Sequence, residues 1–264
     1  MSKHFLDPFE KREFLAEEGI LYIAFGNSFT EEAKMSLASL RRFNENIPVC
    51  FMTDDISTLK ELDDPNLLKV SIDPQHIRAK VDFVDKTPFR KTLYLDSDTL
   101  IARDISDIFE TLSRFDIAVT HDYARKRLKY SKIIPEYEKI PYAFSEVNGG
   151  VFAFNANKKT EAMLKMWRDY FYKYYAQTNG WDQVSLRISL WESQVSMFHM
   201  PCEYNIRSHA NREKQDRFKH EFGEQHMAPR IYHMHYDSEV HRGIFKMKDL
   251  EELEESIKSQ AVWY

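Results

Sequence analysis

The amino-acid sequence predicts an α/β fold in which helices flank a mostly parallel central sheet. Short apolar runs typical of buried strands alternate with stretches whose apolar residues recur at helical spacing. The 264 residues are 43% hydrophobic and 30% charged, which is typical of a globular protein with a substantial core. Because no Pro-, Gly- or Ser-rich linker divides the chain, we expect a single domain over residues 1–264.

Seven short apolar runs are expected to form strands. They lie at 20–25, 48–53, 67–72, 92–95, 115–120, 151–154 and 230–236. Helical stretches separate most of these runs, and this rhythm favours parallel pairing. Ligands bind beyond the carboxyl ends of the strands in such sheets, so the residues that follow each run are candidates for a site.

The first helix is expected directly after the first strand. Ser28 and Glu31 have the spacing of a capping box, which predicts the start of this helix. Later helices are expected at 158–175, 182–191 and 248–258. The segments 122–144 and 207–230 show no clear period, and long loops of this kind are usually functional lids or mobile segments.

Charge and cysteine content narrow the class of protein. A net charge of −5 argues against a nucleic-acid partner, which would need a basic surplus. The N-terminal stretch is too charged for a secretory signal, and no apolar run is long enough for a transmembrane segment. We therefore expect a cytoplasmic protein, with peripheral membrane contact left open. Cys50 and Cys202 lie in apolar contexts and are expected to be buried free thiols.

Two carboxylates follow the apolar run in the segment KTLYLDSDTLI. Asp96 and Asp98 stand one residue apart where the predicted strand ends. Carboxylate oxygens are hard ligands that suit Mg²⁺ or Mn²⁺. The alternative is a simple turn, since Asp and Ser are both favoured in turns. The Asp-x-Asp pattern is short and common, so the rest of the sequence has to decide between the two.

Five segments, taken in order, resemble nucleotide-sugar glycosyltransferases of the GT-A fold. They are ILYIAFGNSFTEEAKMSLASLRR, RAKVDFVDKTPFRKTLYLDSDT, VNGGVFAFNA, WDQVSL and IYHMHY. The likeness is greatest to glycosyltransferase family 8, which includes glycogenin and bacterial lipopolysaccharide galactosyltransferases. The resemblance covers about 19–242 and implies a nucleotide-binding half at 19–120, a sugar and acceptor half at 121–247 and a C-terminal helix at 248–264.

The resemblance implies a divalent cation between the chain and the diphosphate of a donor. Asp96 and Asp98 would hold it, and His235 would supply a third ligand from a distant part of the chain. His233 competes for this role because both histidines lie on the same face of a strand. His235 is preferred because Tyr236 follows it, as an aromatic residue does in the family. An imidazole ligand favours Mn²⁺, with Mg²⁺ as the alternative.

Several further residues are expected to contact the nucleotide by the same likeness. They are Ala24, Phe25, Gly26, Asn27, Asp54, Lys80 and Ser97. Gly26 also suits a tight strand-to-helix connection, and Asp54 suits a turn equally well. Arg78 is the alternative to Lys80, and either of these cations could be a solvated surface charge.

The sugar is expected to contact Asn148, Gly149, Asp182 and Gln183. The glycines beside Asn148 allow close approach of the backbone to a ligand, although a turn or bulge explains them too. By resemblance, Asp182 would bind sugar hydroxyls and Gln183 would lie opposite the leaving group. Asp182 also suits the N-cap of the helix that follows it.

One family residue is missing. After the late histidine, the family carries a lysine that binds the diphosphate, and this chain has none at that place. Arg242 is the expected substitute, with His241 as the alternative, since a guanidinium suits phosphate. Asn179 also replaces an acidic residue of glycogenin-like members. These departures leave open a catalytically silent nucleotide-sugar-binding protein.

The resemblance implies transfer of a hexose from a UDP-sugar, with retention of configuration, to a glycan, lipid or protein acceptor. No carboxylate of the sequence is required as a nucleophile, so a same-face mechanism beside Gln183 is preferred. The basic segment at 125–132 suggests an anionic acceptor, with a solvated charged loop as the alternative. A nucleotidyltransferase is a weaker reading, because the segment after the first strand lacks a Gly-rich, basic phosphate loop.

Overall fold

A seven-stranded sheet runs through the molecule, in the order β3-β2-β1-β4-β7-β6-β8. The computed structural model describes residues 6–122, 124–207 and 229–233. The strands of this sheet are β1 (Ala16–Ile23), β2 (Val49–Thr53), β3 (Leu67–Ser71), β4 (Phe89–Leu95), β6 (Ile117–His121), β7 (Val147–Asn155) and β8 (Met197–His199). A two-stranded sheet pairs β5 (Thr99–Ile101) with β9 (Ile231–His233).

Most of the strand pairs in the large sheet are parallel. β1 pairs in parallel with both β2 and β4, β2 with β3, and β6 with β8. β7 is the exception, because it runs antiparallel to β4 and to β6. The carboxyl ends of β1, β2 and β4 therefore share one edge of the sheet, and the amino end of β7 reaches the same edge.

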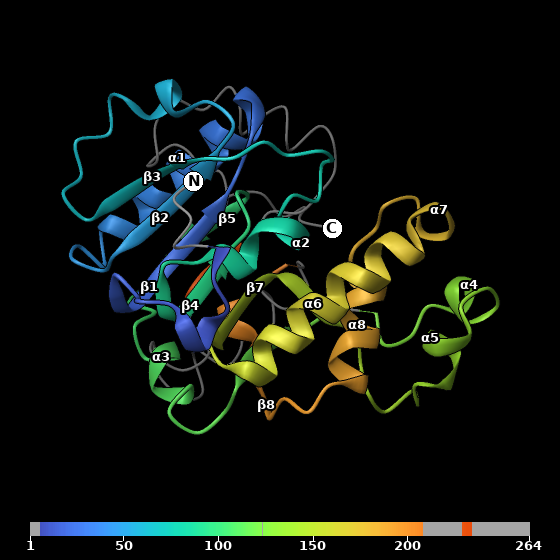
Figure 1. Cartoon of the computed structure of the whole chain (residues 1–264). Coiled ribbons are helices and arrows are strands. Elements are labelled where there is room, and N and C mark those ends of the chain that lie inside the picture. Colours follow the sequence, from blue (N-terminus) through green and yellow to red (C-terminus); the bar gives the residue numbers. More distant parts are fainter. Residues whose placement is uncertain (1–5, 123, 208–228, 234–264) are drawn as a thin grey trace, which may run out of the picture.

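Helices connect the strands. The described helices are α1 (Gly26–Arg41), α2 (Lys80–Phe83), α3 (Ile108–Thr111), α4 (Leu128–Ser131), α5 (Pro135–Lys139), α6 (Lys158–Lys173), α7 (Tyr175–Thr178) and α8 (Gln183–Glu192). Short 3₁₀ turns lie at Phe9–Lys11, Ile56–Leu59, Val84–Lys86 and Cys202–Tyr204. α8 packs against both α6 and β7, and Figure 1 shows α4 and α5 beyond them at the edge of the molecule.

Each face of the sheet has its own apolar core, because successive side chains of a strand point to opposite faces. Ile20 and Tyr22 of β1 pack with Leu37 of α1 on one face. Leu21 of β1 packs in the core that contains Trp167 of α6 on the other face. The α/β architecture with a mostly parallel sheet between helices is thus confirmed.

Three local predictions are wrong. α1 begins at Gly26, and no side chain caps it, so Ser28 and Glu31 form no capping box. The strand expected at 151–154 is too short, because β7 begins at Val147 and includes the Asn148 segment, where its pairing with β6 shifts register as in a bulge. Cys202 is an exposed free thiol, whereas Cys50 is buried as expected.

The segment 122–144 is more ordered than its sequence indicates. It forms α4 and α5, which enclose a small apolar cluster against α8. Tyr137 of α5 and Ile188 of α8 belong to this cluster and are fully buried. The sequence shows no helical period here because each helix is only about one turn long. The predicted helix at 248–258 lies outside the described residues.

Candidate functional site

Acidic and histidine side chains meet at the carboxyl end of β4. Asp96 follows the last residue of this strand, and its backbone N–H donates to the carbonyl of Gly150 in β7 at 2.7 Å. A short turn then carries Asp98 into β5. β5 pairs with β9 so that Thr99 stands opposite His233. Residues far apart in the sequence are thereby brought to one point of the fold.

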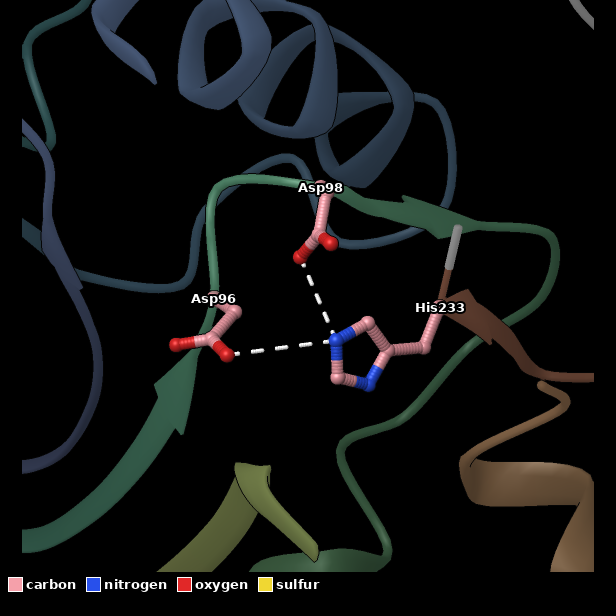
Figure 2. A group of neighbouring side chains, drawn as sticks. All are labelled: Asp96, Asp98 and His233. Carbon is pink, nitrogen blue, oxygen red and sulfur yellow. Dashed lines mark ion pairs between the residues drawn. The ribbon is translucent and has the colours of Figure 1, made fainter. Parts of the chain in front are cut away.

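Asp96, Asp98 and His233 form a group with the geometry of a metal site (Figure 2). Each offers one ligand atom, and these atoms all lie within 4.8 Å of one another. His233 Nε2 lies 3.2 Å from Asp98 Oδ1 and 3.9 Å from Asp96 Oδ2. Two carboxylates and one imidazole are a donor set that suits Mn²⁺ and leaves positions for ligand oxygens.

A hydrogen-bond chain fixes the tautomer of His233. Thr120 Oγ donates to the carbonyl of Val151, so it accepts from Asn205 Nδ2, at 2.7 Å. The Asn205 carbonyl oxygen therefore faces His233 Nδ1, at 2.9 Å, and Nδ1 carries the proton. Nε2 then faces two carboxylates and is the ring nitrogen that can bind a cation. Such a pattern fits a cation between them, with Asn205 orienting the ligand from behind.

Gly150 leaves room for this group. A Cβ at this position would lie 2.2 Å from His233 Cε1 and 2.6 Å from Asp96 Oδ2. Both distances are shorter than any van der Waals contact, so a side chain here would displace two of the three ligands. The absence of a side chain at Gly150 is a second feature that fits a cation at this point.

The structure brings together only part of the predicted ligand set. Asp96 and Asp98 lie side by side as expected, and the histidine beside them is His233, which was the less favoured alternative. His235, Arg242 and His241 lie outside the described residues. Alternation along the strand expected at 230–236 favours neither histidine, and the preference for His235 came only from the resemblance at Tyr236.

Lys80 is buried between carboxylates and is no solvated surface charge. Its ammonium donates to both carboxylate oxygens of Asp96, at 3.0 and 3.1 Å, and to the Gly149 carbonyl at 2.9 Å. It also lies 3.6 Å from Asp182 Oδ2. Tyr94 donates to Asp96 Oδ1 at 2.7 Å. Asp96 is therefore held from two sides, and Lys80 links it to Asp182.

A larger cavity, of about 240 Å³, opens beside the turn after β4. Six predicted residues line it, namely Ala24, Phe25, Lys80, Asp96, Ser97 and Asp98. It is also lined by residues that the sequence did not single out, among them Phe29, Glu32, Ile77 and Tyr94. The cavity is lined by aromatic residues such as Phe25 and Phe29 and by the carboxylates of Asp96 and Asp98. This lining suits a ligand that has both a planar ring and a metal-bound anionic group.

Glu32 is the least expected member of this cavity. It lies on α1, is 4% exposed, and accepts a hydrogen bond from Ser97 Oγ at 2.8 Å. Burial, followed by the negative charge of Asp98, raises the pKa of Glu32 to about 8. The sequence does not indicate that Glu32 belongs to a site, because a charged residue near the start of a polar helix is ordinary.

Three predicted nucleotide contacts do not line the cavity. Gly26 and Asn27 are exposed at the start of α1. Asp54 accepts a hydrogen bond from the Gly26 N–H at 3.0 Å and so ties the end of β2 to α1. Gly26 has φ +69°, a conformation that L side chains rarely adopt. The alternative roles of Gly26 and Asp54 in the connection between strand and helix are thus sufficient to explain both residues.

A smaller cavity, of about 90 Å³, lies on the other side of Asp96. The four residues predicted for the sugar, Asn148, Gly149, Asp182 and Gln183, all line it. Asp182 precedes α8 but makes no capping hydrogen bond. Its Oδ2 is buried and has no hydrogen-bond partner among the residues the structure describes, with only the Lys80 ammonium near it. A buried carboxylate oxygen without a hydrogen-bond partner is suited to accept a hydrogen bond from a ligand hydroxyl.

Two arginines frame the cavities. Arg78 lines both of them, and its Nε lies 3.4 Å from Asp182 Oδ1. Arg127 lines the smaller cavity and stacks over Trp181, with its Cζ 4.4 Å from the ring centre. Arg127 also pairs with the buried Glu146, whose pKa is raised by burial. Neither Glu146 nor Trp181 was expected in the site.

The basic segment is partly tied into the fold. Arg125 donates to the Asp122 carbonyl at 2.6 Å. Lys126 donates to the carbonyls of Glu138 and Ile140, at 2.6 and 2.9 Å. Together with the ion pairs of Arg127, these contacts give three of the basic side chains structural partners.

The comparisons with known proteins agree with this geometry. A family model described as nucleotide-diphospho-sugar transferase matches residues 91–250. Glucoside xylosyltransferase 1 of Rattus norvegicus is 27% identical over 191 residues, which is 65% of this chain and 41% of that protein. The chain thus spans about two-fifths of the length of this curated relative.

Solved structures share the fold. The glycosyltransferase GlyE of Streptococcus pneumoniae superposes with a TM-score of 0.59 at 18% identity, over 94% of this chain and 65% of that one. The galactosyltransferase LgtC, in complex with donor and acceptor sugar analogues, gives 0.56 at 15% identity, over 92% of this chain and 96% of that one. These likenesses confirm the GT-A fold. Among the described residues, no helix combines the length and apolar character that a membrane crossing needs.

Proposed function

Because the chain belongs to the nucleotide-diphospho-sugar transferase family, we propose that it transfers a sugar from a UDP-sugar to an acceptor hydroxyl. One observation carries the proposal. Asp96, which lies in the metal-binding group, lines both cavities, so a ligand could occupy the two cavities with its diphosphate beside the cation. The nucleotide would lie in the larger cavity and the sugar in the smaller one.

The diphosphate would be bound by cations from two sources. A divalent ion held by Asp96, Asp98 and His233, with Mn²⁺ preferred over Mg²⁺, would neutralise charge that develops on the departing diphosphate. Arg78 lines both cavities, and its Nε is buried without a hydrogen-bond partner among the described residues, so its guanidinium could donate to a phosphate bound there. Arg78 is thus a second candidate, in addition to Arg242, for the cation that replaces the family's phosphate-binding lysine.

The sugar would be recognised mainly by Asp182. Its Oδ2 is buried without a hydrogen-bond partner among the described residues, and a sugar hydroxyl could donate to it. Lys80 holds this carboxylate and Asp96 in one fixed arrangement. The rat relative is, by its name, a xylosyltransferase, so a pentose is a second candidate for the transferred sugar, besides the hexose expected from the sequence.

We further propose that configuration is retained. Asp122 is a buried carboxylate of the smaller cavity, but Arg207 and the Ala124 N–H already bind it, so it is poorly placed to act as a nucleophile. Gln183 would instead face the reacting carbon while the leaving phosphate accepts the acceptor's proton. The anomeric configuration of the product, measured by NMR, tests this step, and an inverted product would contradict it.

The acceptor is proposed to be a glycan or a lipid with a free hydroxyl. The anionic-acceptor hypothesis is best probed at Lys129 and Lys132, which are exposed. Lys129 has cation–π contacts with Tyr130 and Trp181, whereas neutralising Arg125, Lys126 or Arg127 would remove hydrogen bonds or ion pairs within the chain. A double substitution of these two lysines by Gln should raise the KM for an anionic acceptor and leave the KM for the donor unchanged. An unchanged acceptor KM would remove the hypothesis.

Thermal unfolding with a panel of nucleotide sugars, with and without Mn²⁺, tests the proposal as a whole. A ligand that binds only the folded chain raises Tm by mass action. We expect UDP-sugars to raise Tm when Mn²⁺ is present, and Asp98→Asn to abolish the metal-dependent part. Absence of a metal-dependent shift with every nucleotide sugar would refute the proposal. Binding without turnover of any acceptor would indicate the silent nucleotide-sugar-binding protein.

A further inference from the structure

A buried carboxylate behind the smaller cavity has no role in the function proposed above. Glu146 directly precedes β7 and is fully buried. Its backbone is fixed on both sides, because its N–H donates to the Arg125 carbonyl at 3.1 Å and its carbonyl accepts from the Asp122 N–H at 3.0 Å. A charged group is costly to bury unless it is paired and hydrogen-bonded, so the contacts of this side chain indicate what it holds in place.

Three side chains contact the Glu146 carboxylate. Tyr137 donates its hydroxyl to Oε1, and the same hydroxyl accepts from the Arg127 N–H at 2.8 Å. Oε2 accepts from Arg127 Nε at 3.3 Å and from Gln183 Nε2 at 3.4 Å. Oε2 is therefore shared between a cation that stacks on Trp181 and the amide that lines the cavity.

The chemistry of these groups sets the orientation of the Gln183 amide. An ionised carboxylate only accepts hydrogen bonds, so Gln183 has to present its NH₂ group to Glu146. The carbonyl oxygen is then the amide atom left for the cavity. This choice matters because transfer passes through an oxocarbenium-like state with positive charge at the reacting carbon. The amide oxygen would stabilise that charge, whereas the NH₂ group would oppose it.

We propose that Glu146 is a positioning residue that holds the Gln183 amide with its carbonyl oxygen toward the smaller cavity. The inference rests on the proposed function for its catalytic meaning, but the orientation itself rests on the contacts alone. Arg127 and Tyr137 also donate to the carboxylate and keep it in place. Burial raises the pKa of Glu146, and the contacts of Tyr137 and Arg127 oppose that rise.

The first test measures orientation without any reaction. Glu146→Leu removes the acceptor, and the ¹⁵N order parameter of the Gln183 side-chain amide should fall to the value of a free side chain. The resonance is assigned by its loss in Gln183→Ala. Glu146→Gln keeps one carbonyl oxygen and should restore much of the order. An order parameter that is the same in Glu146→Leu as in the unaltered protein would overturn the proposal.

The second test is a double-mutant cycle on turnover. Glu146→Leu should lower kcat at least about tenfold with the donor KM changed less than about threefold, as for an interaction that acts in the transition state. In a Gln183→Ala background the same substitution should lower kcat less than about twofold, because the residue it positions is gone. Full additivity of the two losses would overturn the proposal.

A matched control separates positioning from general destabilisation. Asn155 stands at the far end of β7, and its amide donates to the carbonyls of Leu112 and Phe115. Asn155→Ala should lower Tm as Glu146→Leu does, yet leave kcat unchanged; an equal loss of kcat in both variants would count against the proposal. If the unaltered protein turns over no donor, the proposed function fails, and the amide measurement still decides the orientation.

Discussion

His233 is held in the tautomer that a metal ligand needs, since Asn205 accepts the Nδ1 proton. We therefore expect Asn205→Ala to weaken Mn²⁺ binding by about 10- to 100-fold, because the ligand remains but loses its orientation. His233→Ala should weaken it more, because the ligand itself is lost; isothermal titration measures both. His235→Ala is the comparison variant: if it weakens Mn²⁺ binding as strongly as His233→Ala and His233→Ala has little effect, the assignment of His233 is wrong.

The two neighbouring glycines of β7 should respond differently to a methyl group. At Gly150 a Cβ would lie 2.2 Å from His233 Cε1, so Gly150→Ala should abolish Mn²⁺ binding and cost about 1–3 kcal/mol of stability through overpacking. At Gly149 the nearest atom, of Leu186, lies at 3.4 Å. Gly149→Ala should keep Mn²⁺ binding. Denaturant unfolding and metal titration compare the pair, and equal loss of metal binding in both would contradict this account.

At the scale of residues, the sequence predicts site residues at the ends of strands better than site residues that distant elements bring into place. Asp96 and Asp98 could be identified because they end an apolar run and match a family pattern. Glu32 and Glu146 could not, because their importance comes from burial beside other charges, which the packing of distant elements decides. The hydrogen bond between His233 and Asn205 likewise joins distant parts of the chain, and no local pattern encodes it.

At the scale of elements, hydrophobic periodicity finds the long units and misses the short ones. α6 and β2 are predicted within about two residues at each end, as their apolar patterns are strong. β5 and β8 have three residues each, too few to show a period, and they were missed. The start of α1 was misplaced because Asp54, from β2, binds the first N–H, so no local cap was needed.

An ion pair fastens the short helix α5 to α6, and its contribution should depend on pH. The hydrogen bond from Lys173, then that from the Tyr174 hydroxyl, lowers the pKa of Glu136 to about 2. A carboxyl whose folded pKa is depressed stabilises the fold above its unfolded value, near 4.5, and loses this contribution as pH falls toward 2. Glu136 is partly exposed and Lys173 is exposed, so screening by solvent limits the effect to about 0.5–1 kcal/mol.

The matching substitution is Glu136→Gln, measured by urea unfolding at pH 7 and pH 3. The variant should be less stable by about 0.5–1 kcal/mol at pH 7, and the difference should shrink at pH 3. Glu45→Gln, at an exposed carboxylate outside this contact, is the control and should differ little from the unaltered protein at either pH. A difference that grows on acidification would show that Lys173 does not stabilise the ionised carboxylate.

At the scale of the whole molecule, the site is a product of topology. The parallel arrangement of β1, β2 and β4 gathers the carboxyl ends of three strands at one edge, and the antiparallel β7 delivers Gly149 and Gly150 to the same edge. This convergence follows from the predicted fold class, so the location of the site could be anticipated. The antiparallel direction of β7 and the pairing of β5 with β9 could not, because strand pairing is non-local.

The pairing of β5 with β9 makes metal binding a property of the global fold. His233 belongs to β9, whereas Asp98 directly precedes β5, so an ion between them joins two strands that lie outside the large sheet. Opening of β9 would release the ion. The His233 N–H donates to the Ile206 carbonyl at 3.0 Å. Mn²⁺ should therefore slow amide exchange at His233 by a factor that approaches about 100 when its concentration is 100 times Kd.

Hydrogen–deuterium exchange with increasing Mn²⁺ measures this coupling. Leu21, in the centre of β1, is the internal reference, since its amide belongs to the large sheet and should exchange only on global opening. Asp98→Asn should remove the protection of β9 by Mn²⁺ while leaving Leu21 unchanged in the absence of metal. Equal protection of β9 in the variant and the unaltered protein would mean that the ion binds elsewhere, because only a ligand shared by the turn after β4 and by β9 can resist their separation.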